Sequence, residues 1–213
     1  MPSTIITAAG AGNAASISAG NDGVMVLQTG PDGSKVNAVT LDATGNAAVL
    51  GTMTQAGIAT PRMQLLTAVN TTSGTSIDFT SLPSWVKRIT VMFNGVSTNG
   101  TSHMRVRIGS GSLQVTGYVA TSIVTLDTNL TGGITDTTGF VVFSNLAANT
   151  LMGHMVLTLV GGNAWVASHS MRNTTSQIIG GGGNVTLSGA LDRLSLVSTD
   201  TFDAGSVNIL YEG

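Results

Sequence analysis

Three histidines, His103, His154 and His169, are the side chains of this sequence best suited to bind a metal ion or move a proton. They fall in three separate candidate strands, and no two have the spacing of a zinc site. The chain has no cysteine, which excludes disulfide bonds and thiolate metal sites. The sequence therefore predicts no metal and no cofactor, although histidines from neighbouring strands or from symmetry-related copies could still meet.

Paired carboxylates are a second source of chemistry, because glycoside cleavage uses two acids about 5 to 10 Å apart. Asp200 and Asp203 are the closest acidic pair, flanking Thr201 and Phe202. A loop that holds a structural turn or a weak Ca²⁺ suits this spacing better than a catalytic dyad, and a plain solvated turn suits it better than either. Asp127 and Asp136 bracket a threonine-rich segment, which predicts a long loop over residues 127–138. Serine is abundant, but no Gly-x-Ser-x-Gly nucleophile elbow occurs, so no catalytic residue is predicted.

Glycines and aromatic rings offer two binding possibilities. Gly180–Gly183 is a run of four glycines that lacks the Lys and Ser/Thr of a phosphate-binding loop, so it predicts a flexible loop between strands. Trp165 follows Gly161, Gly162, Asn163 and Ala164 at the edge of a predicted hairpin, and it is the best exposed candidate for stacking on a sugar. Tyr118, Phe140 and Phe202 are weaker candidates, because most of the few rings of this chain belong in its core.

The composition argues against an enzyme and against a charged partner. Of 213 residues, 42% are hydrophobic and 8% are charged, where an ordinary domain has about 25% charged residues. The net charge of -2 gives no basic footprint for nucleic acid or an anionic membrane. No apolar run approaches the roughly 20 residues of a membrane helix, and the first residues do not form a secretory signal. A chain so poor in charge tends to associate with itself, so we expect assembly with its own copies.

The hydrophobic pattern predicts an all-β protein with two regions. Residues 1–60 form an extended anchoring segment with a small β-meander of three apolar stretches, centred on residues 24–27, 36–41 and 47–50, and too small to fold alone. Residues 61–213 form a jelly-roll-like β-sandwich. Its strand candidates are residues 64–69, 86–96, 103–109, 113–119, 139–143, 154–160, 164–170, 184–187, 191–197 and 207–211. Alternation is clear in two of them. Ile89, Val91 and Phe93 share one face of the candidate at 86–96, and Arg105 and Arg107 share one face of the candidate at 103–109.

Several segments resemble the virion proteins of tailed bacteriophages. These are SIDFTSLPSWVKRITV at residues 76–91, FNGVSTNG at 93–100, DAGSVNILYEG at 203–213 and, more weakly, the linker-like VTLDATGN at 39–46. The resemblance covers about residues 63–213. It implies a head fibre, tail fibre or minor structural protein, usually a homotrimer, with an N-terminal part that anchors and a C-terminal sandwich that points outward. The string at 76–91 carries no catalytic motif, and we expect its bulky residues to plug one end of the sandwich.

We therefore expect a structural protein of the virion surface, either a small head fibre or capsid decoration or a tail fibre. Its expected partners are its own copies, as a homotrimer, and a capsid or tail protein. The alternative is a receptor-binding module that recognises host surface glycan, with Trp165 as the contact. A depolymerase is disfavoured because acidic side chains are sparse.

Overall fold

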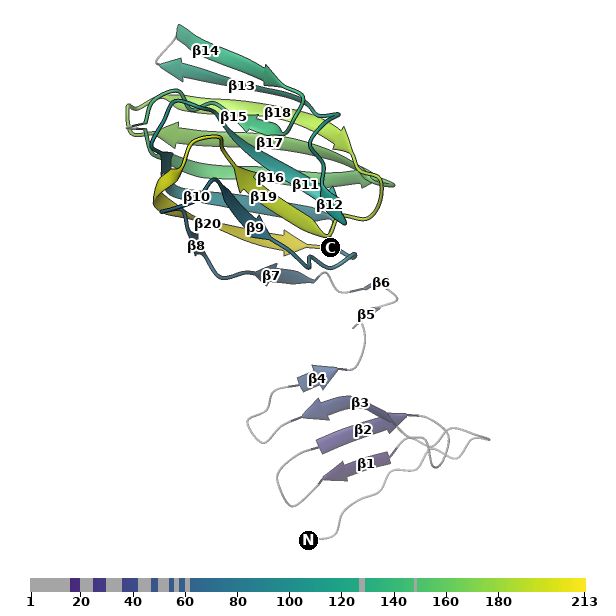
Figure 1. The fold of residues 1–213 in the computed structure, drawn as a ribbon. Coiled ribbons are helices and arrows are strands. Elements are labelled where there is room, and N and C mark those ends of the chain that lie inside the picture. The colour runs from purple at the N-terminus through teal and green to yellow at the C-terminus, as the bar shows by residue number, and fades with distance from the viewer. Residues whose placement is uncertain are drawn as a thin grey trace. The chain divides into compact units, whose positions relative to one another are not determined.

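The computed structural model describes residues 62–126, 129–147 and 149–213, together with six short strands among the first 61 residues. The chain divides into two compact units, Met1–Pro61 and Arg62–Gly213 (Figure 1). The described residues form strands, turns and loops without a helix, which confirms the all-β prediction. Accordingly, the described part of the chain contains no helix with the length and apolar character needed to cross a membrane.

The N-terminal unit contains an antiparallel meander in which each strand pairs with the next. Its strands are β1 (Ser16–Ala19), β2 (Met25–Thr29), β3 (Val36–Leu41) and β4 (Ala47–Val49). The meander was predicted with three strands, and β1 is the fourth, in a stretch of small residues without periodicity. A further antiparallel pair follows in the chain, β5 (Thr54–Gln55) and β6 (Ile58–Ala59).

The C-terminal unit is a sandwich of two antiparallel sheets. The larger sheet has the order β14-β13-β18-β17-β16-β10-β20-β7, with β8 also pairing with β20. The smaller sheet has the order β12-β11-β19-β9, with β15 pairing with β11. The strands are β7 (Met63–Leu65), β8 (Val69–Asn70), β9 (Ser76–Phe79), β10 (Arg88–Thr98), β11 (Met104–Ser110), β12 (Ser112–Leu113), β13 (Val119–Leu126), β14 (Asn129–Asp136), β15 (Phe140–Val142), β16 (Leu151–Gly161), β17 (Ala164–Asn173), β18 (Ile178–Thr186), β19 (Arg193–Val197) and β20 (Phe202–Glu212).

The core lies between the two sheets and follows the alternation that the sequence predicts. Ile89, Val91 and Phe93 of β10 are buried, whereas the residues between them face outward. On β11, Arg105 and Arg107 occupy the outer face while the residues flanking them are buried. A strand turns successive side chains to opposite faces, so a period of two buries one face and leaves the other for polar contacts.

Two predicted loops are strands instead. Gly180–Gly183 lies in the middle of β18, paired with β13 on one side and β17 on the other. The threonine-rich segment forms β14, the hairpin partner of β13, and Asp127 lies outside the described residues. Glycine and threonine are common in turns, which suggested loops at both places. The backbone of either residue can still form the hydrogen bonds of a sheet, and pairing with long neighbouring strands provides them.

The string at residues 76–91 forms an edge and a corner of the sandwich. Its first four residues are β9, the edge strand of the smaller sheet, with Phe79 buried. Trp85 packs against Tyr211 of β20 with 5.5 Å between ring centroids. The guanidinium of Arg62 lies 5.7 Å from the centre of the Trp85 ring. The string therefore ties the smaller sheet to the end of the larger one.

Candidate functional site

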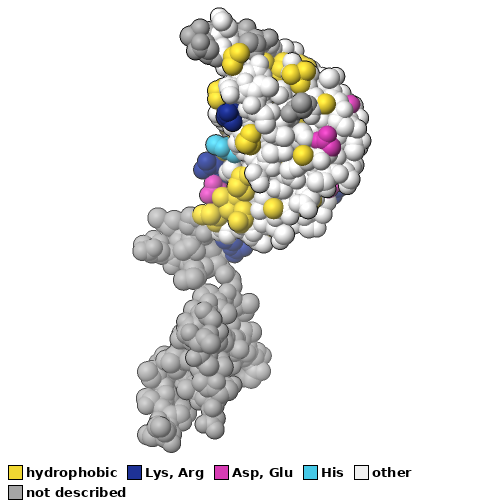
Figure 2. Space-filling view, turned by 90° about the vertical axis from the view of Figure 1, so that its left-hand side faces the viewer, with side chains coloured by type: hydrophobic (Ala, Val, Ile, Leu, Met, Phe, Trp, Pro, Cys, Tyr) yellow, Lys and Arg dark blue, Asp and Glu magenta, His cyan; other side chains and the backbone are white. Residues whose placement is uncertain are grey.

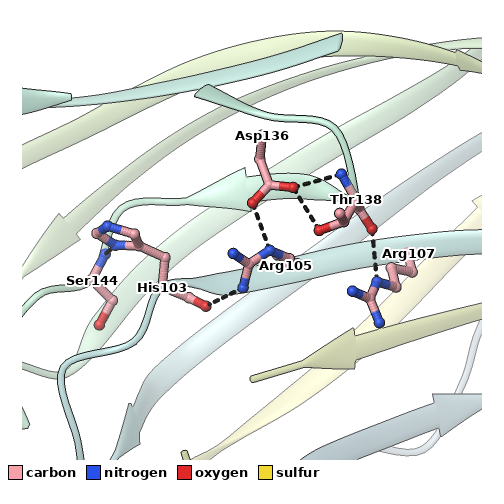
Figure 3. A network of polar contacts seen from close by, with 6 residues as sticks. All are labelled: His103, Arg105, Arg107, Asp136, Thr138 and Ser144. Carbon is pink, nitrogen blue, oxygen red and sulfur yellow. Dashed lines mark hydrogen bonds and ion pairs between the residues drawn. The ribbon is translucent and has the colours of Figure 1, made fainter. Parts of the chain in front are cut away.

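The smaller sheet carries a polar network on its outer face, built around Asp136 (Figure 3). Alternation on β11 places Arg105 and Arg107 side by side, and β14 ends at Asp136 directly above them. Arg105 donates from Nε to Asp136 Oδ2 at 2.7 Å and from Nη1 to the carbonyl of His103 at 3.1 Å. Thr138 donates to Asp136 Oδ1 from both its amide and its hydroxyl, each at 2.6 Å. These contacts tie the segment after β14 to the sheet.

Electrostatics keep Asp136 ionised within this network. Burial by itself would raise the pKa of this carboxyl, but the hydrogen bonds from Thr138 and the Arg105 guanidinium outweigh burial and lower it. Arg107 uses Nε to donate to the carbonyl of Thr138 at 2.7 Å. The network joins β11 to the end of β14 and the residues that follow it, and so positions these segments.

The polar face continues across β19 and β9. Register places Arg107 opposite Ser195, and Ser195 opposite Asp78. Ser195 and Ser76 donate their hydroxyls to Asp78 Oδ1 at 2.6 and 2.7 Å. An open depression of about 210 Å³ adjoins this group and is lined by Asp78, Thr80, Leu113, Arg193 and Leu194. Arg193 is itself paired with Asp192 at 2.8 Å. Ser195 is fully buried, so this face offers a ligand the exposed Asp78 carboxylate and the exposed Ser76 hydroxyl.

The three histidines lie in different environments. His169 is buried in the larger sheet, with Nε2 3.0 Å from Ser122 Oγ, and burial lowers its pKa to about 4. His103 accepts the amide hydrogen of Ser144 at Nδ1, 3.0 Å away, and burial lowers its pKa as well. His154 is exposed on β16. Among the described residues, no three His, Cys, Asp or Glu side chains gather closely enough to hold a metal ion.

The Ser122 and His169 contact has the geometry of a nucleophile and its base, and sequence reasoning missed it. Ser122 is fully buried, and its Oγ also accepts the amide hydrogen of Phe143 at 3.0 Å. A nucleophile must reach a substrate, which a hydroxyl with no exposed surface cannot do. The pair joins β13, β17 and the segment after β15 inside the core. Only the strand register brings these two residues together.

Asp200 and Asp203, the acidic pair closest in sequence, both accept hydrogen bonds from residues of this chain. Asp200 Oδ2 accepts the amide hydrogen of Ser102 at 2.6 Å, and Asp203 accepts the hydroxyl hydrogen of Ser97. Asp200 also fills the space beside Gly100, where a built Cβ would lie 2.2 Å from its Oδ2. The two carboxylates thus bind two different residues of the chain, and Asp203 lies in β20 rather than in the solvated turn that the sequence favoured.

The expectation that Trp165 is an exposed ring is wrong. Its side chain is 2% exposed, and Tyr118, Phe140 and Phe202 are equally buried. Trp165 pairs with Leu159 across the β16–β17 hairpin and points into the sandwich. The pocket beside it measures about 70 Å³, far below the roughly 300–1,000 Å³ of typical ligand sites. The position of Trp165 next to a hairpin turn does not say which face of the sheet its ring lies on. In the structure the large apolar ring lies on the core side.

The outer face of the larger sheet is broad and nearly free of charge. Strand register defines four rows of outward residues across it. The rows are Val119, Asn184, Val166, Thr158, Arg88, Glu212 and Met63; Thr121, Gly182, Ser168, Val156, Thr90, Leu210 and Leu65; Ile123, Gly180, Ser170, His154, Met92 and Asn208; and Thr125, Ile178, Arg172, Met152, Asn94, Ser206 and Asn70.

The charged side chains within these rows are Arg88, Glu212 and Arg172, and the first two form an ion pair at 3.1 Å. Figure 2 shows one side of the molecule, on which neutral surface prevails and the few charged side chains lie mostly near one margin, some of them side by side. Val119, Ile123, Val166 and Ile178 are exposed at one end of this face, and Met63 and Leu65 at the other. We call this surface the neutral face. Its scarcity of charge lowers the cost of covering it, provided that its hydroxyl and amide groups find hydrogen-bond partners.

Comparison with family models, with curated protein sequences and with solved structures gives no match.

Proposed function

We propose that this chain is a structural protein of a tailed-bacteriophage virion surface, a small head or tail fibre or capsid decoration, and that it functions as a homotrimer. The observation that carries the proposal is the neutral face, which spans the larger sheet with Arg88, Glu212 and Arg172 as its charges. Desolvating charges at an interface is costly, whereas apolar side chains are covered favourably and neutral polar ones can be covered where they find hydrogen-bond partners. The face thus suits permanent contact with a protein surface.

The sequence resemblance supplies the virion setting. The string at residues 76–91 resembles segments of phage structural proteins, and it forms a structural edge and corner of the sandwich. In this proposal residues 1–60 anchor the protein to a capsid or tail protein, and the sandwich points outward. The buried Ser122 and His169, and the acids that hold loops, serve the fold of such a particle component.

The mass of the purified chain in solution tests the assembly. Native mass spectrometry and sedimentation at micromolar concentration are expected to give three times the 21.5 kDa mass of one chain. A species that stays monomeric under those conditions contradicts the proposal. Electron microscopy of whole particles with a labelled antibody then tests the virion setting, and absence of label from the particle surface contradicts that part.

A second candidate function is recognition of host surface glycan, and the depression on the smaller sheet favours it. Its lining combines Asp78 and Thr80 with Arg193, groups that hydrogen-bond to sugar hydroxyls. This alternative predicts saturable binding to host polysaccharide. Thr80→Arg, which fills the depression, is expected to abolish binding, and His154→Gln, on the opposite sheet, is expected to leave it intact. Equal binding by both variants would remove this candidate.

A further inference from the structure

Two consecutive backbone amides are each held in place with the help of a histidine. They belong to Phe143 and Ser144, the residues directly after β15, and we call these two residues the crossing pair. The Phe143 amide donates to Ser122 Oγ at 3.0 Å, and that hydroxyl lies 3.0 Å from Nε2 of His169. The Ser144 amide donates to Nδ1 of His103 at 3.0 Å, as Figure 3 shows. The crossing pair thus depends on one histidine beside the smaller sheet and one in the larger sheet.

A glycine allows His169 to reach this position. Register places His169 on β17 opposite Gly181 on β18, and Gly181 opposite Ser122 on β13. A Cβ built on Gly181 would lie 2.5 Å from Cε1 of the His169 ring, so the ring lies across β18 in the space that this glycine leaves. Its neighbours in this row, Ser122, Gly181 and Met155, carry no charge. His169 is 7% exposed, and a proton on its ring would place an unpaired charge in the core.

The contact with Ser144 fixes which nitrogen of His103 carries a hydrogen. An Nδ1 that accepts an amide hydrogen is unprotonated, so the neutral ring carries its hydrogen on Nε2. A second proton must go to Nδ1, where it displaces the hydrogen bond from Ser144. The ring of Phe143 also packs on His103, with 4.8 Å between the ring centroids. Protonation of His103 therefore removes one anchor of the crossing pair.

The charged groups around His103 favour the neutral ring on balance. Burial has the largest effect and lowers the pKa of His103, and the positive charge of Arg105 acts in the same direction. Asp136 acts in the opposite direction but is itself paired with Arg105 at 2.7 Å. Asp200 binds the amide of Ser102, the residue before His103. The ring is thus neutral at pH 7 in the folded protein.

The residues after the crossing pair are only partly satisfied in their present position. Residues 145–147 are exposed, and the Asn149 amide donates to the carbonyl of Leu146 at 3.0 Å, within the turn itself. Ser144 Oγ and Asn149 Oδ1 are buried and have no hydrogen-bond partner within the described part of the chain. Solvent would pair both oxygens, so this segment gains hydrogen bonds when it moves outward.

We propose that residues 143–147 form an acid-released latch, which detaches from the sandwich when His103 and His169 take up protons while both sheets stay folded. The crossing pair lies outside the strands, so its release breaks no ladder bond. β15 is the fixed end, because Val142 pairs with Met104 of β11. Phe143 is 8% exposed, so release presents an apolar ring that the closed form hides. The latch is independent of the proposed homotrimer.

Hydrogen exchange of the natural chain, followed for single amides by nuclear magnetic resonance, tests the latch without a substitution. Protection is expressed relative to an unfolded peptide at each pH. A ring whose pKa is about 4 when closed and 6.5 when released opens about twentyfold more often at pH 5 than at pH 7. The amides of Phe143 and Ser144 are expected to lose at least this factor of protection, independently of low concentrations of urea.

The Val91 amide in β10 is the reference, because β10 is paired with a strand on each side. It should stay better protected at pH 5 and should depend on urea, as an amide that exchanges by global unfolding does. Equal protection of the crossing pair at both pH values contradicts the latch. A urea dependence equal to that of Val91 contradicts it too, because the whole sandwich would then be unfolding.

A single thiol reports on the same step, because the natural chain has no cysteine. Ser144→Cys replaces a buried hydroxyl by a thiol of similar size. Its reaction with dithiodipyridine, corrected with a model thiol, is expected to become at least tenfold faster from pH 7 to pH 5. Val142→Cys is the matched control, since this buried position pairs with β11 and should stay slow. Equal acceleration of both thiols would indicate global unfolding and overturn the latch.

Non-titrating variants then assign the protons. His103→Asn and His169→Gln keep an amide group near the positions of Nδ1 and Nε2 but take up no proton. Together, in the Ser144→Cys background, they are expected to abolish the acceleration between pH 7 and pH 5. His154→Gln, at an exposed position, should leave the acceleration intact. An acceleration that survives in the combined variant would assign the release to other groups and overturn the proposal.

Discussion

Acidification is expected to destabilise this protein through His169, whose imidazole is buried beside Ser122. Burial lowers the pKa of His169 from 6.5 to about 4, and each pKa unit is worth about 1.4 kcal/mol. The folded state holds the neutral ring down to about pH 4, whereas the unfolded chain takes up a proton near pH 6.5. The contribution of His169 is thus fully present above pH 6.5, is lost as the pH falls towards 4, and amounts to about 3 kcal/mol.

The structure gives the reason for this loss. Ser122 Oγ accepts the amide hydrogen of Phe143, so the hydroxyl hydrogen of Ser122 is free to point at His169 Nε2. A proton on Nε2 would displace that hydrogen and place a positive charge in the core. Burial lowers the pKa of His103 too, and its Nδ1 must be unprotonated to accept the Ser144 amide hydrogen. His103 therefore adds a contribution of the same sign.

Urea unfolding followed by tryptophan fluorescence, at about pH 7, 5.5 and 4 and at constant protein concentration, measures this dependence. His169→Gln is expected to be less stable at pH 7 but to lose less stability on acidification, by about 3 kcal/mol between pH 7 and 4. His154→Gln, at an exposed position, is the matched control and should follow the natural chain. Parallel pH profiles for the natural chain and His169→Gln would refute the reasoning, because the burial of His169 would then carry no charge penalty.

Three further predictions concern the sandwich. Asp136→Asn is expected to cost about 2 kcal/mol of unfolding free energy, because it removes the charge that accepts from Arg105 at 2.7 Å; chemical unfolding near neutral pH checks this, and an unchanged midpoint contradicts it. Gly181→Ala is expected to destabilise by about 1–3 kcal/mol, because its Cβ would meet the Thr121 carbonyl oxygen at 2.2 Å; thermal unfolding against Gly180→Ala, which has room, is the comparison. Tyr118 is expected to ionise at about pH 12, because burial raises its pKa, and an ultraviolet titration compared with Tyr118→Phe would reveal earlier ionisation if the ring were accessible.

Much of the architecture was predictable from short-range pattern. The alternation of Ile89, Val91 and Phe93 on β10, and of Arg105 and Arg107 on β11, assigns these residues to opposite sides of a sheet without knowledge of the partner strands. The low charge and the turn spacing indicated an all-β protein with a sandwich. These inferences succeeded because a period of two is a local property of an extended backbone.

The candidate sites depended on register, which the sequence does not display. The Ser122 and His169 contact joins residues 47 positions apart, and Arg105 and Asp136 are 31 apart. Gly180–Gly183 has the composition of a loop, and its place in β18 follows from pairing with β13 and β17. Trp165 stood next to turn residues, yet its ring faces the core.

By itself the sequence determined that this chain forms β layers, has no thiol chemistry and carries little charge, because these follow from residue types and from the period of two. Only the tertiary structure decided which strands are neighbours, and so which side chains share a face. Neighbouring strands come from distant parts of the chain, and a shift of one residue in their pairing would turn every side chain to the other side. The neutral face and the burial of Trp165 and His169 all follow from that pairing.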